Sequence, residues 1–476
     1  MSWEYSPAPE SAEIANIRPS YRMFVDGQFV DGGGEPLKTI NPATGEALAE
    51  VATASTADVD RAVRAAHRAF ERSWGKMPGA ERAKHIFRIA RLIAERSSEL
   101  AVLETLNTGK PIRESRDVDL PLASAHFFHY AGWADKLGYA GYGPDPRPLG
   151  VAAQVIPWNF PLLLAARTIA PALACGNTVV LKPADTTPLT ALVLAEILQQ
   201  AELPPGVVNI LPGGRDVGAE LIGHPDVHTV AFTGSTEVGK SVQRAVAGSG
   251  KKLVLELGGR SANIVFDDAP LDQAVEGIVT GCFLNQGEVG CAGSRLLVQE
   301  SIVDDLVDRL LARIGTLRIG DPLDKNTDIG AINSREHLDR IQELVAAGEE
   351  EGAQRWTSSC PLPDRGFFFP PTVFTNVSPA MRIAREEIYG PVLSVLTFRT
   401  ADEAVAKANN TPYGLSAGIW SEKGSRTLWM AERLRAGVVW ANTFNRFDPA
   451  APFGGYRESG FGREGGRAGL EAYLNV

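Results

Sequence analysis

Apolar runs and amphipathic segments alternate through the middle of the chain. Four apolar runs predict strands, at Val151–Ile156, Thr178–Lys182, Val207–Leu211 and Thr229–Thr233. Helical patterns follow them at Pro161–Leu173, Thr190–Ala201, Val217–Ile222 and Glu237–Ala247. Strands that alternate with helices favour a parallel sheet, and continuous apolar strands favour one covered by helices on both faces. We therefore expect a doubly wound α/β unit here.

A second alternating series follows Glu256. Its predicted strands are Ala262–Phe266, Arg295–Gln299 and Val392–Phe398. Its predicted helices are Asp272–Leu284, Ile302–Ile314, Ser334–Ala347, Ala401–Asn409 and Ser425–Leu434. Before the first series we expect a mostly helical lead-in, with helices over Thr56–Trp74 and Ala80–Asn107. The pattern as a whole predicts two α/β units.

Composition narrows the classes of protein that fit this pattern. A chain of 476 residues, 44% of them hydrophobic, is too long for one ordinary domain. A net charge of −10 with no basic face argues against nucleic-acid binding. The 4 cysteines include no CxxC pair, so neither a disulfide framework nor a zinc site is expected. The sequence shows no signal-peptide pattern and no long apolar run, so we expect no membrane association and a cytoplasmic location.

Two motifs at the ends of predicted strands are candidates for nucleotide binding. Gly234 and Ser235 lie between a strand and a helix, where exposed amides and the helix dipole suit a pyrophosphate. Lys182 and Asp185 follow another strand at the sheet edge that binds nucleotides, where they could hold ribose hydroxyls. Each motif also fits an ordinary role, Ser235 as a helix N-cap and the charged pair as a surface turn.

Three further motifs are candidates for catalysis. Asn159 lies between two prolines in Ile156–Pro161, where its amide could donate to an oxyanion or cap a neighbouring loop. Glu256 ends an apolar stretch before two glycines, which suits either a general base or a solvent-facing boundary residue. Cys291 lies in a glycine-rich loop, where a buried cysteine is more often packing than nucleophile.

Taken together and in order, these motifs resemble the aldehyde dehydrogenase superfamily. The segments that carry the resemblance are PWNFP, KPA, FTGSTEVG, ELGG, the Asn285–Arg295 loop, EEIYGPV and PFGGYRESGFGRE. The resemblance runs from about Met23 to the end of the chain. It implies a nucleotide-binding domain over residues 1–130 and 150–257 and a catalytic domain over residues 258–458. Residues 131–149 and 459–476 complete the expected subunit as a small, shortened β oligomerisation element and a C-terminal return segment.

The resemblance also implies roles for individual residues. Asn159 would be the oxyanion-hole amide, Glu256 the general base, and Glu464 a carboxylate that assists proton transfer. The implied cofactor is NAD, with NADP possible, and the implied substrate is a small-molecule aldehyde oxidised to a carboxylic acid. The residues implied to bind the cofactor are Ile156, Trp158, Lys182, Asp185, Gly234, Ser235, Glu387 and Tyr389.

The position where the family carries its nucleophilic cysteine is Gly290 in this chain. Cys291 is one residue further on, and adjacent Cα atoms are about 3.8 Å apart with side chains in different directions. Attack requires the reacting atoms within roughly 3–3.5 Å, so Cys291 could substitute only if the loop rearranges. Three hypotheses remain open: an active enzyme that uses Cys291 or another route, a silent NAD-binding partner or scaffold of an active relative, and an engineered Cys-to-Gly variant.

The oligomerisation element also departs from the family. We expect a shortened oligomerisation hairpin over Leu137–Leu149 and a C-terminal segment that lacks the family's usual final strand. We expect a homo-oligomer, most simply a dimer, with the hypothesis that its assembly differs from the usual family dimer or tetramer.

Overall fold

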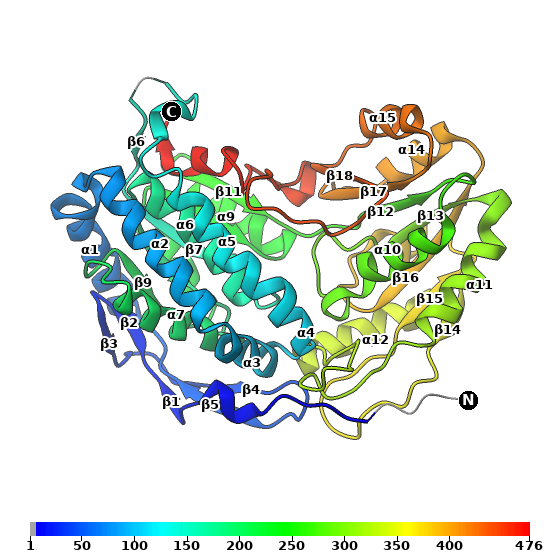
Figure 1. The fold of residues 1–476 in the computed structure, drawn as a ribbon, viewed down its shortest axis with the longest axis horizontal. Helices are drawn as coiled ribbons and strands as arrows, with labels where there is room; N and C mark the ends of the chain where they lie inside the picture. Colours follow the sequence, from blue (N-terminus) through cyan, green and yellow to red (C-terminus); the bar gives the residue numbers. More distant parts are fainter. Residues whose placement is uncertain (1–5, 144) are drawn as a thin grey trace.

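Two α/β units form the molecule, each built on its own sheet (Figure 1). The structure is a computed structural model that describes residues 6–143 and 145–476. One sheet has 8 strands in the order β19-β11-β10-β7-β8-β9-β2-β3, and the other has 7 in the order β14-β15-β16-β13-β12-β17-β18. This architecture confirms the predicted fold class of two doubly wound α/β units.

The centre of the first sheet is parallel. Its parallel strands are β7 (Val151–Val155), β8 (Thr178–Lys182), β9 (Val208–Ile210), β10 (Thr229–Thr233) and β11 (Lys252–Glu256). Antiparallel strands complete its edges: β2 (Met23–Val25), β3 (Gln28–Val30) and β19 (Gly460–Phe461). The chain winds from β7 to β9 on one side and returns to β10 on the other, so the strand order reverses between β7 and β10.

Helices cover this first sheet. They are α1 (Thr56–Arg72), α2 (Gly79–Glu95), α3 (Ser97–Thr108), α4 (Ile112–Glu114), α5 (Leu120–Ala131), α6 (Pro161–Cys175), α7 (Leu189–Gln200), α8 (Arg215–Gly223) and α9 (Thr236–Val246). Helix α6 is almost wholly buried because it packs against α2 and α5 on one side and the sheet on the other (Figure 1). Its apolar sequence is the expected consequence of that double coverage.

The second sheet is parallel except for β14. Its strands are β12 (Ala262–Val265), β13 (Arg295–Gln299), β14 (Gln354–Thr357), β15 (Thr372–Thr375), β16 (Val392–Phe398), β17 (Ser416–Trp420) and β18 (Val438–Ala441). The helices of this unit are α10 (Leu271–Phe283), α11 (Val303–Ile314), α12 (Arg335–Glu350), α13 (Arg382–Arg385), α14 (Ala401–Asn409) and α15 (Gly424–Ala431).

The lead-in differs from the mostly helical prediction. Besides β2 and β3, the strands β1 (Ser20–Tyr21), β4 (Leu37–Ile40) and β5 (Ala47–Val51) form a separate three-stranded sheet before α1. These strands are short and half exposed, so they lack the apolar runs that marked the central strands. The single helix predicted over Ala80–Asn107 is wrong as well, because Arg96 separates α2 from α3.

The last residues divide between two sheets. β19 extends the first sheet beside β11, whereas β20 (Leu474–Asn475) pairs with β6 (Arg147–Pro148). The predicted oligomerisation element therefore holds β6, β19 and β20, of which β6 and β20 pair with each other and β19 joins the first sheet. The domain boundaries themselves stay a prediction.

Candidate active site

Neighbouring strands of the first sheet bring four of the predicted motifs to one edge. Val155 lies opposite Lys182 in the next strand, and Thr233 lies opposite Glu256. The loops after β7 and β10 leave the sheet where the strand order reverses, which is where open α/β sheets bind their ligands. A cavity of about 420 Å³ opens at this point, with walls from both α/β units.

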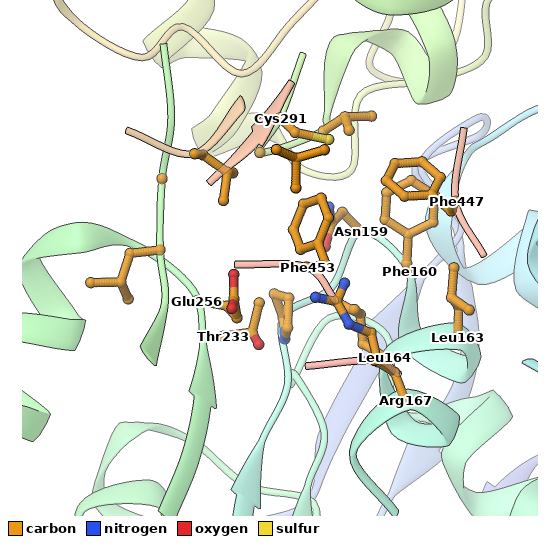
Figure 2. A pocket seen from close by; sticks show the side chains of 18 of the residues that line it. Asn159, Phe160, Leu163, Leu164, Arg167, Thr233, Glu256, Cys291, Phe447 and Phe453 are labelled. Carbon is orange, nitrogen blue, oxygen red and sulfur yellow. The ribbon is translucent and has the colours of Figure 1, made fainter. Parts of the chain in front are cut away.

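Most of the predicted site residues line this cavity (Figure 2). Those that do are Trp158, Asn159, Gly234, Ser235, Glu256, Gly290, Cys291, Glu387 and Tyr389. Ile156, Lys182, Asp185 and Glu464 lie outside the lining. Aromatic and aliphatic side chains, among them Phe160, Leu164 and Phe453, form much of the remaining wall, as is usual for a small-molecule site.

Asn159 faces the loop that contains Gly290. Its Nδ2 donates to the backbone oxygen of Glu288 at 2.9 Å, and its own backbone oxygen accepts from Nδ2 of Asn285 at 3.0 Å. Pro161 begins α6 two residues later and fixes the direction of the chain. The amide is 6% exposed and is thus held firmly beside the loop.

Glu256 is a buried acid without hydrogen bonds. It is 4% exposed, and neither carboxyl oxygen has a hydrogen-bond partner in the part of the chain that the structure describes. Burial raises the pKa of Glu256 well above its usual value, and the nearby Glu464 raises it further. Arg167 and Arg463 have a smaller effect that lowers this pKa. A carboxylate in these surroundings is a stronger base than an exposed one, once it has lost its proton.

Arg167 belongs to the site, although the sequence motifs did not single it out. Its Nε lies 2.6 Å from Oε2 of Glu464, and its guanidinium stacks on the ring of Phe453 at 4.5 Å. In Figure 2 its head group lies near Asn159 and Glu256 around the centre of the cavity. A signal was present, because Arg167 is the one charged residue of the otherwise apolar α6 segment Pro161–Cys175.

Gly290 leaves room for a side chain. A Cβ at this position would have Cδ2 of Leu415 at 3.6 Å and the backbone oxygen of Leu257 at 4.0 Å as its nearest neighbours. Its φ also lies outside the left-handed region that favours glycine. Gly287 differs, since a Cβ there would lie 2.1 Å from the backbone oxygen of Gly390. Glycine is thus required by the fold at position 287 but not at position 290.

Cys291 is buried and poorly suited to attack. It is 3% exposed, and its Sγ donates to Oδ1 of Asn445 at 3.6 Å. Burial raises the pKa of its thiol to about 12, against a smaller opposing effect of Arg167. The reactive form of cysteine is the thiolate, so little of it exists here at neutral pH.

The predicted phosphate- and ribose-binding residues lie along the same sheet edge. Ser235 is the N-cap of α9, and its hydroxyl accepts from the amide of Val238 at 3.3 Å. The buried Lys182 donates from Nζ to the backbone oxygen of Pro183 at 3.1 Å. Burial lowers the pKa of its ammonium group, whereas the nearby Asp185 raises it. The backbone amide of Ile156 donates to the oxygen of Lys182 at 3.2 Å, which ties the ends of β7 and β8 together.

Glu387 and Tyr389 approach the cavity from the second unit. Glu387 accepts from the amide of Gly259 at 2.9 Å, and burial raises its pKa to about 7. The ring of Tyr389 meets that of Trp158 at 5.5 Å, edge to face. These contacts fix side chains of both units around one cavity.

Residues 6–143 and 145–476 contain neither a metal-binding cluster of acidic, histidine and cysteine side chains nor a membrane-spanning helix. No group of three or more His, Cys, Asp or Glu side chains there is arranged to hold a metal ion. Within the same residues, every helix is too short or too polar to cross a bilayer.

Known proteins resemble this chain over almost its whole length. The model of the aldehyde dehydrogenase family matches residues 29–476. An aldehyde dehydrogenase of Enchytraeus buchholzi is 45% identical over 96% of this chain and 94% of its own length. The NAD+ complex of an aldehyde dehydrogenase from Bacillus cereus has a TM-score of 0.94 and 39% identity, covering 99% of this chain and 98% of that one.

A third similar protein is the indole-3-acetaldehyde dehydrogenase AldA of P. syringae. It was solved as a cysteine-to-alanine mutant in complex with NAD+ and IAA. The two structures agree with a TM-score of 0.94 and 40% identity over 97% of each chain. From the family match, the fold and these identities, it follows that this chain belongs to the aldehyde dehydrogenase family.

Proposed function

We propose that the cleft binds NAD+ and an apolar aldehyde, and that Gly290 leaves it without the nucleophile of covalent aldehyde oxidation. The observation that carries the proposal is the cavity itself, which Asn159, Glu256 and Gly290 line together. The unsubstituted chain then retains cofactor and substrate binding but forms no covalent bond to the aldehyde. The chain would then be a catalytically inactive member of the family that still binds NAD+.

The residues at the sheet edge fit a dinucleotide. Ser235 stands at the start of the 11-residue helix α9, whose free amides and dipole favour a pyrophosphate. Lys182 uses one hydrogen bond to Pro183, so its ammonium group retains donor capacity for ribose hydroxyls. The buried hydroxyl of Thr186, four residues on, has no partner in the described part of the chain. Asp185 would repel a 2′-phosphate and thus favours NAD over NADP.

The chain's own groups would orient the aldehyde and handle its protons. A bound NAD+ supplies the acceptor for the hydride that leaves the substrate carbon. The second N–H of the Asn159 amide and the backbone N–H of Gly290 are the proposed donors to the aldehyde oxygen. Glu256, once deprotonated, would take a proton from water, and its apolar surroundings raise its basicity for that step.

Residue 290 decides whether a thioester can form. A glycine has no atom with which to attack a carbonyl carbon, while its N–H is still available as a donor. The neighbouring thiol of Cys291 is directed to Asn445 and has a raised pKa, so we propose that it does not replace the missing group. The tolerated Cβ at position 290 supports the view that only the side chain is missing.

The proposed assembly is a homo-oligomer, with pairing to an active relative as the alternative. The β6–β20 pair, two residues on each strand, would give only a small oligomerisation sheet. Light scattering that finds an ordinary family tetramer would reject the hypothesis of an altered assembly.

Two measurements on the unsubstituted chain test the proposal. Titration with NAD+, followed by fluorescence or calorimetry, should show saturable binding that Lys182→Met weakens by about tenfold or more. A panel of aldehydes with NAD+ should give no NADH. Absence of NAD+ binding contradicts the proposed cofactor site, and rapid NADH formation contradicts the proposed loss of the nucleophile.

A further inference from the structure

The loop that leads to Gly290 begins with a turn that needs support. Asn285, Gln286 and Gly287 have φ angles of 50°, 53° and 78°, so three consecutive residues are left-handed. Residues other than glycine rarely adopt this backbone conformation, because their Cβ crowds the following carbonyl oxygen. Such turns persist where the surrounding structure holds them in place.

A carboxyl group from the helical lead-in holds the first residue of this turn. Oε2 of Glu114 accepts from the backbone amide of Asn285 at 2.7 Å, in a buried position. On its other side, the Asn285 side chain donates to the backbone oxygen of Asn159 at 3.0 Å. The contact of Glu114 therefore links the helices of the first unit directly to the main chain of the loop.

A π-helical turn, η3 (Ser115–Asp119), follows Glu114 and shapes its surroundings. The amide of Leu120 donates to the oxygen of Ser115, so residues five apart lie above one another in this turn. Glu114 and Asp119 are five residues apart, and the carboxyl groups of both interact with the ammonium group of the fully buried Lys110. Nζ of Lys110 lies 2.5 Å from Oδ2 of Asp119. π-turns are rare and occur frequently at functional sites.

Lys110 connects this cluster to the cavity. Its ammonium group lies 3.9 Å from the centre of the Phe160 ring, and Phe160 lines the cavity. The cluster of Lys110, Glu114 and Asp119 is therefore packed directly behind the cavity wall.

Glu114 can hold the turn without adding a buried charge. Burial raises its pKa to about 8; the nearby Asp119 raises it further, whereas Lys110, the Asn285 amide and Arg113 lower it. At neutral pH the Glu114 carboxyl is mainly the neutral acid, and Lys110 is paired with Asp119 instead. A neutral acceptor of the same shape should therefore serve equally well.

We infer that Glu114 is a positioning residue, which holds the amide of Asn285 and thereby fixes the left-handed turn that presents the N–H of Gly290 to the cavity. Its catalytic consequence rests on the proposed function, whereas the positioning of the loop does not. The test therefore has one arm that needs no activity.

The first arm measures hydrogen exchange of backbone amides in the chain with Gly290 unchanged. Glu114→Leu removes the acceptor at similar size and should speed exchange across residues 285–290 by about tenfold. Glu114→Gln keeps a neutral acceptor oxygen and should stay within about twofold of the unsubstituted chain. The matched control is Glu104→Leu, because Glu104 is also buried and interacts with Lys110 and Asp119, but accepts from the amide of Leu162 instead of that of Asn285.

The control should leave exchange of the loop unchanged and affect the start of α6. Unchanged exchange at residues 285–290 in Glu114→Leu overturns the inference. Equal acceleration of the loop in Glu104→Leu overturns it as well, because the effect would then be general loosening.

The second arm uses the Gly290→Cys background and NADH formation. Adding Glu114→Leu should lower kcat by about tenfold or more while the Kd for NAD+ stays within about twofold, and Glu114→Gln should restore kcat. An unchanged kcat overturns the catalytic part of the inference. If Gly290→Cys alone is inactive, the proposed function fails, and the exchange arm still decides the role of Glu114.

Discussion

Because Glu256 is buried, we expect the stability of the protein to depend on pH, and we expect Glu256→Gln to remove the part of that dependence that comes from this residue. The carboxyl is 4% exposed, has no hydrogen-bond partner within the described residues, and has a pKa raised well above its usual value by burial. An acid whose folded pKa is raised favours folding below the unfolded pKa. It loses that contribution as pH rises toward the folded pKa, because the unfolded chain ionises first.

The size of this effect follows from proton linkage. Each pH unit between the unfolded and folded pKa values lowers the free energy of unfolding by about 1.4 kcal/mol. Raising the pH through this interval should therefore destabilise the unsubstituted chain at this group by up to about 1.4 kcal/mol per pH unit. Glu256→Gln cannot ionise and should lack this contribution.

Urea unfolding at the two pH values, followed by tryptophan fluorescence, measures the difference. Other buried acids such as Glu104 and Glu114 titrate in both proteins, so their contributions cancel in the comparison. We expect Glu256→Gln to gain stability relative to the unsubstituted chain between about pH 5 and about pH 7, by up to about 1.4 kcal/mol per pH unit. An equal stability difference at both pH values would refute the raised pKa of Glu256.

Three further predictions concern single residues. Cys291→Ala should leave NADH formation by the Gly290→Cys variant within about twofold, because the Cys291 thiol is held by Asn445; a large loss in a steady-state assay would make Cys291 a participant. Asp185→Ser should strengthen NADP+ binding relative to NAD+ by about tenfold, measured by parallel titrations, since it removes a carboxylate that repels a 2′-phosphate; an unchanged ratio would remove Asp185 from the site. Lys110→Met should destabilise the protein by about 3–5 kcal/mol in urea unfolding, because Asp119 would remain as an unpaired buried charge, and Asp119→Leu in addition should recover much of the loss; no recovery would show that packing, not charge, is responsible.

The sequence predicted those parts of the site that follow directly from strand ends. Lys182, Ser235 and Glu256 each end or follow an apolar run, and parallel strands bring such ends to one edge. The position of Asn159 beside the loop of Gly290 came from the family resemblance and not from periodicity, because the two segments belong to different sheets.

Other parts depend on contacts between distant segments and could not be predicted. The ion pair of Arg167 with Glu464 forms because the end of the chain returns to α6, and no local pattern encodes that return. Of the five short strands before α1, β2 has only three residues, all of them buried, and the other four are partly exposed pieces without strong apolar alternation. The π-turn after Glu114 likewise has no signature in residue type.

Steady-state NADH formation by the Gly290→Cys variant tests most directly whether the cleft lacks only a thiol. A cysteine side chain fits at this position, and the proposed donors and base surround the same cavity. We expect the variant to oxidise an apolar aldehyde at least about a thousandfold faster than the unsubstituted chain, a gain that covalent catalysis can supply. A correctly folded variant that binds NAD+ yet shows no gain would contradict the claim, because the cleft would then lack more than the sulfur atom.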